Sequence, residues 1–263
     1  MTLRADFLAL HRPGDPLLLP NAWDAGSARL LTALGFAAVA TTSSGFAATL
    51  GRPDGATTRE ETLAHAGALA AAVDVPVSAD LENGFADSPA GVAGTVTEAR
   101  GTGLAGCSVE DATGRADQPL YARPAAVERV AAAAEAAGDL VLTARCENHL
   151  HGRDDLADTI ARLQAYQEAG ADVLYAPGLR DAAAIATVCR EVDRPVNALL
   201  VAGGPTPAEL AAAGVARVSV GGTFAWNALS ALVDAARELQ AGGVGFLDRT
   251  GPAREVMPRA FRG

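Results

Sequence analysis

The sequence predicts a parallel (β/α)₈ barrel of the TIM type, formed by residues 1–263 as a single domain. Short apolar segments rich in β-branched residues alternate with longer alanine-rich segments of helical pattern along the whole chain. Eight short segments of this kind are present, which is the strand number of the barrel, and the chain length suits one barrel domain. A doubly wound sheet normally contains a glycine-rich phosphate-binding turn, whereas Gly203-Gly204 and Gly221-Gly222 are pairs typical of ordinary loops.

The predicted elements alternate in chain order. The strands comprise residues 17–19, 37–42, 76–82, 106–111, 140–147, 173–176, 195–200 and 216–220. The helices between them comprise residues 58–72, 89–102, 124–137, 156–169, 182–191 and 207–213. A further helix over residues 229–239 precedes a tail, residues 242–263, that is rich in Gly, Arg and Pro. Because this helix and tail exceed what is needed to close one barrel, we expect them to pack on a neighbouring subunit of a homotetramer or dimer.

Composition indicates a globular protein of the cytoplasm. Apolar residues make up 49% of the chain and the mean hydropathy is +0.16, so the chain can bury a large core. The longest apolar stretches are too short to cross a bilayer, and the N-terminal segment lacks the apolar region of a signal peptide. Three widely spaced cysteines, Cys107, Cys146 and Cys189, suit neither a disulfide framework nor a zinc site.

Charge restricts the partners and the chemistry. The net charge of -10 and a pI near 4.8 disfavour binding to nucleic acid or to an anionic membrane surface. A small anionic metabolite would therefore need a local positive centre. All 21 basic residues are arginine, and the absence of lysine excludes Schiff-base chemistry, pyridoxal phosphate and a P-loop.

Polar residues gather where the predicted strands end. In a (β/α)₈ barrel the catalytic groups lie at the carboxyl ends of the strands and in the loops that follow them. The residues at these positions are Asp24, Ser43, Ser44, Asp80, Glu82, Glu110, Asp111, Arg145, Glu147 and Asn197. Their repeated occurrence at strand ends predicts an active site at this rim of the barrel.

Acidic residues in two neighbouring strand ends predict a metal site. Asp80 and Glu82 are two residues apart, so an extended strand would direct both carboxylates to the same side. Glu110, at the end of the next strand, would reach the same rim. Carboxylate oxygens without a His or Cys cluster favour Mg²⁺ or Mn²⁺. The alternative is that each acid separately caps a loop or is solvated.

Arg145 and Glu147 share one face of the fifth predicted strand. An arginine directed into the rim can bind a substrate carboxylate and stabilise an enolate formed from it. Its alternative role is a buried ion pair with Glu147 or Asp80, and both roles can hold together. After the second strand, Ser44 and Gly45 lie in a predicted tight turn whose N–H groups could hold an anionic oxygen.

From about residue 17 to residue 229 the sequence resembles the isocitrate lyase/phosphoenolpyruvate mutase superfamily. The matching stretches occur in that family's order and spacing, and they read LPNAWDAGSARLL, SSGFAATLGRPDG, SADLENGF, SVEDA, LTARCEN, YQEAGADVLYAPG, PVNALL and GVARVSVGG. The resemblance implies a homotetrameric barrel enzyme in which a Mg²⁺ ion is held, mostly through water, by Asp80, Glu82 and Glu110.

The resemblance also implies the substrate site. Ser44 and Gly45 would hold the substrate carboxylate or oxyanion, Arg145 would bind the carboxylate, and Asp54 would lie near the reacting carbon. The further substrate-binding residues expected in or beside the matching stretches are Trp23, Phe46, Asp80 and Asn197.

The loop after Glu110 departs from the family. Its C–C lyases carry a Lys-Lys/Arg-Cys-Gly-His loop here, whereas this chain reads DATGRADQPLYARP, without Cys or His. Isocitrate-type cleavage and authentic mutase chemistry are therefore not expected in their usual form. The proton donor stays open between Tyr121 in this loop and His149 or His151 after the fifth strand, and Glu147 is a further catalytic candidate.

The function expected from these residues is a Mg²⁺-dependent lyase or decarboxylase. It would cleave a C–C bond of a small 2-oxo acid, or of a related di- or tricarboxylate, through an enolate. Two alternatives remain, namely an enzyme that cleaves or rearranges a P–C bond, such as a phosphonopyruvate hydrolase, and a non-catalytic protein that binds a 2-oxo acid.

Overall fold

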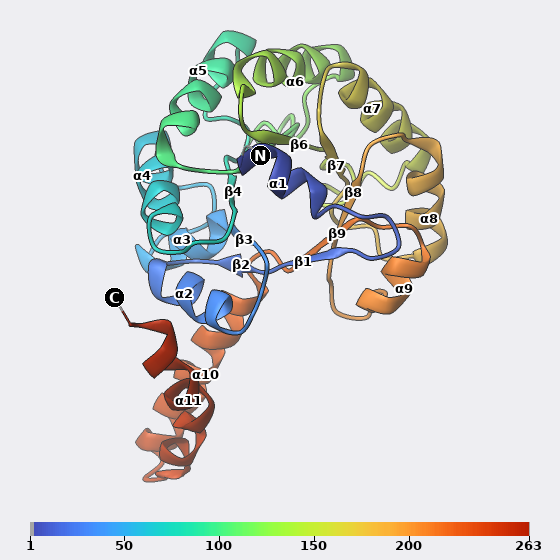
Figure 1. The fold of residues 1–263 in the computed structure, drawn as a ribbon. Helices are drawn as coiled ribbons and strands as arrows, with labels where there is room; N and C mark the ends of the chain where they lie inside the picture. Colours follow the sequence, from blue (N-terminus) through green and yellow to red (C-terminus); the bar gives the residue numbers. More distant parts are fainter. Residues whose placement is uncertain (1–2, 263) are drawn as a thin grey trace.

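The computed structural model describes residues 3–262 and forms a closed ring of parallel strands surrounded by helices, shown in Figure 1. The sheet order is β1-β9-β8-β7-β6-β5-β4-β3-β2, and every pairing is parallel. The strands are β1 (Leu17–Leu19), β2 (Asn21–Ala22), β3 (Val39–Thr41), β4 (Val77–Asp80), β5 (Gly106–Glu110), β6 (Val141–Arg145), β7 (Val173–Tyr175), β8 (Val196–Leu199) and β9 (Arg217–Ser219).

Strands β1 and β2 are two halves of one barrel strand, interrupted at Pro20. Proline has no N–H to donate to a neighbouring strand, so the ladder breaks there. The first half pairs with β9 and the second with β3, which closes the ring. Counted in this way the barrel has eight strand positions, and each of the eight predicted strands overlaps an observed one, which confirms the predicted fold class.

The described helices are α1 (Leu3–Ala9), α2 (Ala25–Ala33), α3 (Ser43–Thr49), α4 (Arg59–Ala70), α5 (Pro89–Ala99), α6 (Arg123–Ala137), α7 (Leu156–Glu168), α8 (Ala182–Glu191), α9 (Pro207–Ala212), α10 (Thr223–Gln240) and α11 (Gly251–Ala260). Short 3₁₀ segments, η1 (Arg100–Thr102) and η2 (Gly245–Thr250), follow α5 and α10. The six predicted inter-strand helices correspond to α4 through α9. Helices α1, α2, α3 and α11 were not predicted, and α10 begins six residues before the helix predicted over residues 229–239.

Helix starts follow ordinary capping chemistry. Side chains at Thr58, Asp155, Asp181 and Thr206 each accept a hydrogen bond from a backbone N–H in the first turn of α4, α7, α8 and α9. Such caps satisfy donors that have no partner inside the helix. They fix where each helix begins, and hence the length of the rim loop before it.

Helix α1 lies across the end of the barrel at which the strands begin (Figure 1). Its Phe7 is fully buried in a small apolar cluster with strand residues that include Leu17, Ala40 and Val141. Glycine at position 106 makes room for this ring, because a Cβ there would lie 2.9 Å from Phe7 Cε1. The N-terminal end of the barrel is thereby closed, which leaves the carboxyl ends of the strands as the open rim.

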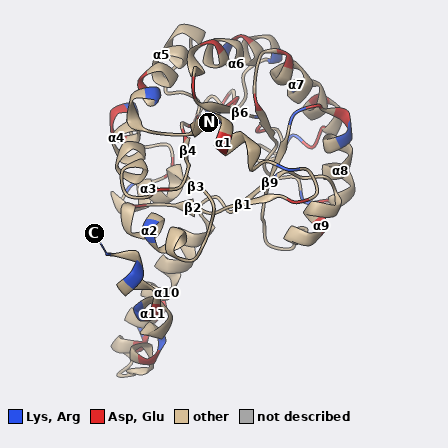
Figure 2. Cartoon of the chain, in the orientation of Figure 1, with Lys and Arg blue, Asp and Glu red and all other residues tan. Residues whose placement is uncertain are grey.

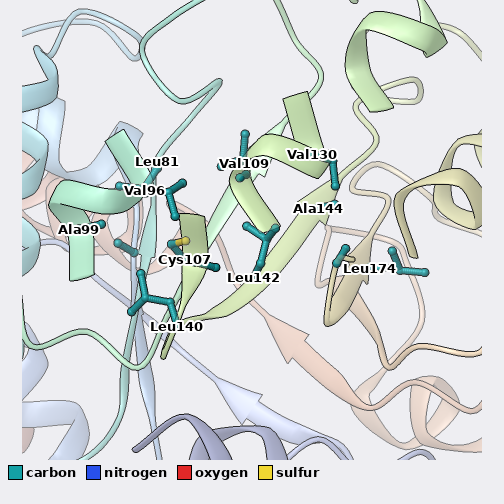
Figure 3. Packing of buried hydrophobic residues seen from close by; sticks show 14 of the residues in the cluster. Leu81, Val96, Ala99, Cys107, Val109, Val130, Leu140, Leu142, Ala144 and Leu174 are labelled. Carbon is teal, nitrogen blue, oxygen red and sulfur yellow. The ribbon is translucent and has the colours of Figure 1, made fainter. Parts of the chain in front are cut away.

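The main apolar core lies between the strands and the outer helices. Figure 3 shows part of it, with Val96 and Ala99 of α5 beside Cys107 of β5. Cys107 and Cys146 are completely buried, and burial raises the pKa of the Cys107 thiol to about 12. All three cysteines are free, as predicted, and the two buried ones pack as small hydrophobic residues.

Helices α10 and α11 form an arm that projects from the barrel (Figure 1). Ala225 is the buried residue of α10, whereas large apolar side chains along the helix are exposed, among them Trp226, Leu232 and Leu239. Acidic and basic residues are interspersed over the outer helices and the arm (Figure 2). Within residues 3–262, no helix has the length and apolar composition required to cross a lipid bilayer.

Candidate active site

A cavity of about 160 Å³ opens at the carboxyl ends of the strands. It lies where catalytic sites of this fold are found, because the loops that follow the strands meet there. Parallel register brings the key side chains together, since Asp80 pairs with Ser108 across β4 and β5, and Glu110 pairs with Arg145 across β5 and β6. The lining includes the predicted residues Ser43, Ser44, Asp54, Asp80, Arg145 and Asn197.

Arg145 is the centre of the rim. Its three guanidinium nitrogens each contact a different carboxylate, with Nη1 at 2.8 Å from Asp80, Nη2 at 2.9 Å from Glu110 and Nε at 2.9 Å from Glu147. The ion-pair alternative is confirmed for Asp80 and Glu147, and Glu110 is a third partner that was not predicted. Tyr175 lies beneath the guanidinium, 5.5 Å from ring centroid to Cζ. These three ion pairs hold the Arg145 guanidinium rigidly. Two of its N–H groups take no part in them.

Acidic side chains outnumber basic ones at this rim, and burial favours the protonated form of some of them. Burial, followed by nearby carboxylates, raises the pKa of Glu82 to about 7, even though Thr57 donates a hydrogen bond to it. Burial likewise raises the pKa of Glu110 well above its usual range, against the opposing effect of Arg145. Four acidic side chains, those of Asp80, Glu82, Glu110 and Glu147, thus gather near one guanidinium, and all but Glu82 contact it.

This donor set fits a hard divalent cation, which prefers carboxylate oxygens and would favour the ionised form of these acids when bound. Among residues 3–262, no three His, Cys, Asp or Glu side chains converge as direct ligands of one ion. A cation held by one or two carboxylates and completed by water is compatible with that geometry, and Mg²⁺ is commonly bound in this way.

Glu82 reaches the rim for a different reason from the one predicted. Strand β4 ends at Asp80, so the two-residue alternation of a strand does not extend to Glu82. Glu82 instead adopts a left-handed backbone, with φ of 49°, and its N–H donates to Asp80 Oδ1 at 3.2 Å. The two acids are neighbours through a turn, and the strand-period argument for Glu82 was wrong.

The predicted tight turn at Ser44 and Gly45 is the start of helix α3. Thr42 caps this helix by accepting a hydrogen bond from the Gly45 N–H, and the Ser43 N–H donates to Asp80 Oδ2 at 3.3 Å. Gly45 is required by packing, because a Cβ would lie 2.6 Å from Thr42 Cγ2 and 2.9 Å from Trp23 Cβ. The Gly45 N–H is therefore already engaged, whereas Ser44 lines the cavity with its hydroxyl 3.2 Å from that of Thr42.

Trp23 and Phe46, which were predicted to bind the substrate, lie outside the cavity lining and pack behind the rim residues. The ring of Phe46 stacks on His65 at a centroid separation of 3.9 Å, and His65 Nε2 lies 3.0 Å from the carbonyl oxygen of Trp23. Burial lowers the pKa of His65, so the imidazole is neutral at pH 7. These residues position the β2–α2 loop next to α3.

The structure places Tyr121 outside the cavity lining. Its hydroxyl donates to Asp87, and the Arg129 guanidinium lies 4.0 Å from the ring centroid. Residues 112 and 120 pair as an isolated antiparallel bridge, which folds the loop back on itself. His149 is held by Asp154 and Thr159, His151 is exposed, and Leu150 between them lines the cavity.

Sequence reasoning missed Tyr175, Ser78, Ser108 and Arg217, all of which line the cavity. Arg217 and Ser219 are two apart in β9, so both side chains point into the barrel. An arginine within the predicted strand 216–220 was a signal that could have identified it. Asn197, which was predicted, donates to Ser219 Oγ at 3.0 Å and accepts from Arg217 Nε at 3.0 Å.

Comparison with known proteins identifies the family. The family model described as phosphoenolpyruvate phosphomutase matches residues 7–240. The chain belongs to the phosphoenolpyruvate phosphomutase family. This membership confirms the resemblance seen in the sequence.

Two similar proteins align with nearly the full length of this chain. An uncharacterized protein of Mycobacterium tuberculosis is 36% identical over 255 residues, covering 96% of this chain and 95% of the relative. A crystal structure of a Burkholderia cenocepacia J2315 protein described as a lyase/mutase has a TM-score of 0.93 and 53% identity, covering 99% of this chain and 97% of that one.

A crystal structure of 2,3-dimethylmalate lyase, from the same superfamily, has a TM-score of 0.85 and 26% identity. It covers 100% of this chain and 96% of that lyase. Proteins similar to this chain thus include lyases and mutases, which supports an enzyme of this general class.

Proposed function

We propose that the protein is a Mg²⁺-dependent lyase or decarboxylase that cleaves a C–C bond of a small 2-oxo acid, or of a related di- or tricarboxylate, through an enolate. One observation carries the proposal, namely the cluster of four acidic side chains near Arg145, three of which contact it, beside a small cavity that Asp80 and Arg145 line. An oxaloacetate acetylhydrolase that is 25% identical, with a TM-score of 0.82, was solved with the product oxalate, which supports a small 2-oxo acid as substrate.

The rim residues have distinct tasks in this proposal. Asp80, Glu82 and Glu110 would hold the divalent cation, which supplies Lewis-acid polarisation of the substrate carbonyl when bound. Arg145 keeps the three carboxylates that contact it in place and directs its remaining N–H groups to the substrate carboxylate. The Ser44 hydroxyl, which also lines the cavity, would donate to a substrate oxygen.

The loop that follows Glu110 contains no cysteine, so it favours a cleavage reaction in which no cysteine exchanges a proton with the substrate. Asp54, which is exposed and lines the cavity, is the acid near the reacting carbon that could exchange a proton with the enolate. Tyr121 hydrogen-bonds Asp87 and does not line the cavity, so we do not assign it the proton. Among the C–C cleavage reactions considered, decarboxylation requires the fewest catalytic side chains, because only the enolate carbon must be protonated.

The test of the proposed function is a turnover screen of the purified protein with Mg²⁺. Oxaloacetate, 2-methylisocitrate, 2,3-dimethylmalate and phosphonopyruvate would be supplied separately, and products would be followed by NMR. Release of a 2-oxo acid or carbon dioxide supports the proposal, whereas phosphate from phosphonopyruvate alone would assign P–C cleavage. Tight binding of oxalate without turnover of any compound would indicate a metabolite-binding protein.

Asp80→Ala is expected to weaken Mg²⁺ binding at least tenfold, because Asp80 is the acid that contacts Arg145, Ser43 and Glu82 at once. Calorimetric titration of Mg²⁺ into the wild-type and variant proteins measures the effect. Asp15→Ala, at an exposed acid outside the rim, is the matched control. Equal affinity in wild type and Asp80→Ala would show that the cation site is elsewhere.

We also propose that the arm mediates a homotetramer, or at least a dimer. Trp226, Leu232 and Leu239 of α10 are 50%, 65% and 59% exposed, and an apolar helix face of this kind marks an interaction surface. Light scattering at micromolar concentration is expected to give a multiple of the 26.5 kDa chain mass, and Leu232→Glu to reduce that mass. A monomeric wild type would contradict this proposal.

A further inference from the structure

The floor of the cavity contains a second arginine, Arg217, in a setting unlike that of Arg145. Arg217 is 4% exposed and lines the same cavity. Its Nε donates to Asn197 Oδ1 at 3.0 Å, Nη2 donates to Thr143 Oγ1 at 3.0 Å, and Nη1 lies 3.2 Å from His11 Nε2. Within residues 3–262, no carboxylate forms an ion pair with it, so this buried positive charge has only neutral partners.

His11 is neutral and does not act as a counter-charge. Its Nδ1 lies 3.0 Å from the carbonyl oxygen of Phe7, which requires a proton on Nδ1 and leaves Nε2 as the acceptor for Arg217. Burial, followed by the charge of Arg217, lowers the pKa of His11 to about 3. Burial also lowers the pKa of Arg217 to about 10, as expected for a guanidinium without an anion beside it.

The positive charge in this cavity that has no carboxylate partner among the described residues is therefore that of Arg217, at the floor. At the rim, Arg145 is surrounded by three carboxylates, whereas Arg217 uses three of its five N–H groups on neutral acceptors. A buried charge without a partner is costly, and buried charges in proteins are normally paired. The arrangement is explained if an anion that enters through the rim supplies the missing charge.

Two serine side chains add possible hydrogen-bond donors to the lining of the same cavity. Ser78 of β4 and Ser108 of β5 line the cavity, and neither hydroxyl hydrogen-bonds to another described residue. Ser78 lies two residues before Asp80, and Ser108 two residues before Glu110. One two-residue repeat in a tilted barrel strand separates side-chain layers by about 5 to 7 Å along the axis.

We propose that Arg217, with Ser78 and Ser108, forms a floor subsite that binds the second carboxylate of a linear dicarboxylate. The 2-oxo acid end of the same molecule occupies the rim, so this inference rests on the proposed function. An extended four- or five-carbon chain spans the separation between the two layers, and the cavity of about 160 Å³ suits a ligand of that size. The substrate class is thereby narrowed from 2-oxo acids to 2-oxo dicarboxylates.

A matched pair of ligands isolates the contribution of the second carboxylate. 2-Oxoglutarate and 2-oxopentanoate share a five-carbon 2-oxo acid and differ only in the terminal group, and oxaloacetate and 2-oxobutanoate form the corresponding four-carbon pair. Affinities would be measured by calorimetry in Mg²⁺, with oxalate as a probe of the rim alone. We expect the wild type to prefer the dicarboxylate at least tenfold in one of the two pairs.

Arg217→Met removes the charge and keeps the volume of the side chain. This variant is expected to reduce the preference to less than threefold while changing oxalate affinity less than threefold. Thr143→Val, which removes one neutral acceptor and retains the cation, is the matched control and should keep the preference. Circular dichroism and thermal unfolding would establish that each variant is folded, and Arg217→Gln replaces Arg217→Met if the latter is not.

Three outcomes would overturn the floor subsite. They are a wild type without preference in either pair, a preference that survives in the folded Arg217 variant, and an equal loss of oxalate and dicarboxylate affinity, which would make Arg217 a structural residue. The proposed function fails separately, through absence of turnover in the substrate screen. An Arg217-dependent preference without turnover would support the subsite and contradict the enzyme.

Discussion

Replacing Arg145 with alanine is expected to reduce turnover at least a thousandfold and to lower the free energy of unfolding by about 3 to 5 kcal/mol. The guanidinium contacts Asp80, Glu110 and Glu147 at 2.8 to 2.9 Å, and its side chain is only 14% exposed. Its removal leaves three carboxylates in one partly dry place without a counter-charge. Some of them must then take up protons, which costs free energy at neutral pH.

The stability loss should also depend on pH, with a sign that identifies its cause. Without Arg145, the pKa values of Glu110 and Glu147, already raised mainly by burial, would rise further. Carboxylates with raised pKa values in the folded state bind protons more tightly than they do in the unfolded chain. The variant should therefore lose more stability as the pH increases, and be closest to the wild type in mild acid.

Urea unfolding at several pH values, together with turnover of the substrate identified by the screen, measures both effects. Arg153→Ala is the matched control, because Arg153 is exposed and pairs with Asp158 only at 3.4 Å. A surface pair of that kind contributes about 0.5 kcal/mol or less. If Arg145→Ala were as stable and as active as Arg153→Ala, the central place of Arg145 in the rim would be refuted.

The periodicity of apolar residues was sufficient to predict the barrel, because this fold depends on a strand pattern that recurs eight times along the chain. The segment 182–191 was predicted with the bounds that α8 has, and Asp80, Glu110 and Arg145 meet at one rim because parallel strands end at the same face. Helix α3 was missed because TTSSGF is a composition typical of a turn. Its helix forms because Thr42 caps it and Gly45 permits close packing against Trp23.

The finer features of the site depend on contacts between distant segments. Neither the triple engagement of Arg145 nor the position of Tyr121 beside Asp87, 34 residues earlier, follows from local spacing. Glu82 joined the rim through a left-handed turn that the strand pattern does not encode. Arg217 was overlooked because its partners, Asn197, Thr143 and His11, come from three other parts of the chain.

The buried pair of His11 and Arg217 should make the protein sensitive to acid. The pKa of His11 falls from 6.5 to about 3, because burial and the nearby Arg217 charge both disfavour the imidazolium. The unfolded chain therefore binds a proton that the folded protein rejects between these pH values. His11 contributes its full stability above pH 6.5, and that contribution is lost as the pH falls toward 3.

We expect this one residue to account for about 2 to 3 kcal/mol of the stability lost between pH 7 and pH 4. His11→Gln retains an acceptor for Arg217 and cannot be protonated in this range, so its stability should fall less steeply than that of the wild type. His151→Gln, at an exposed histidine, is the matched control and should follow the wild-type curve. Denaturant unfolding across the pH range measures the stability of each variant. Parallel curves of stability against pH for wild type and His11→Gln would contradict the prediction. They would mean that His11 is protonated in the folded protein and that the Arg217 guanidinium beside it does not suppress its charge.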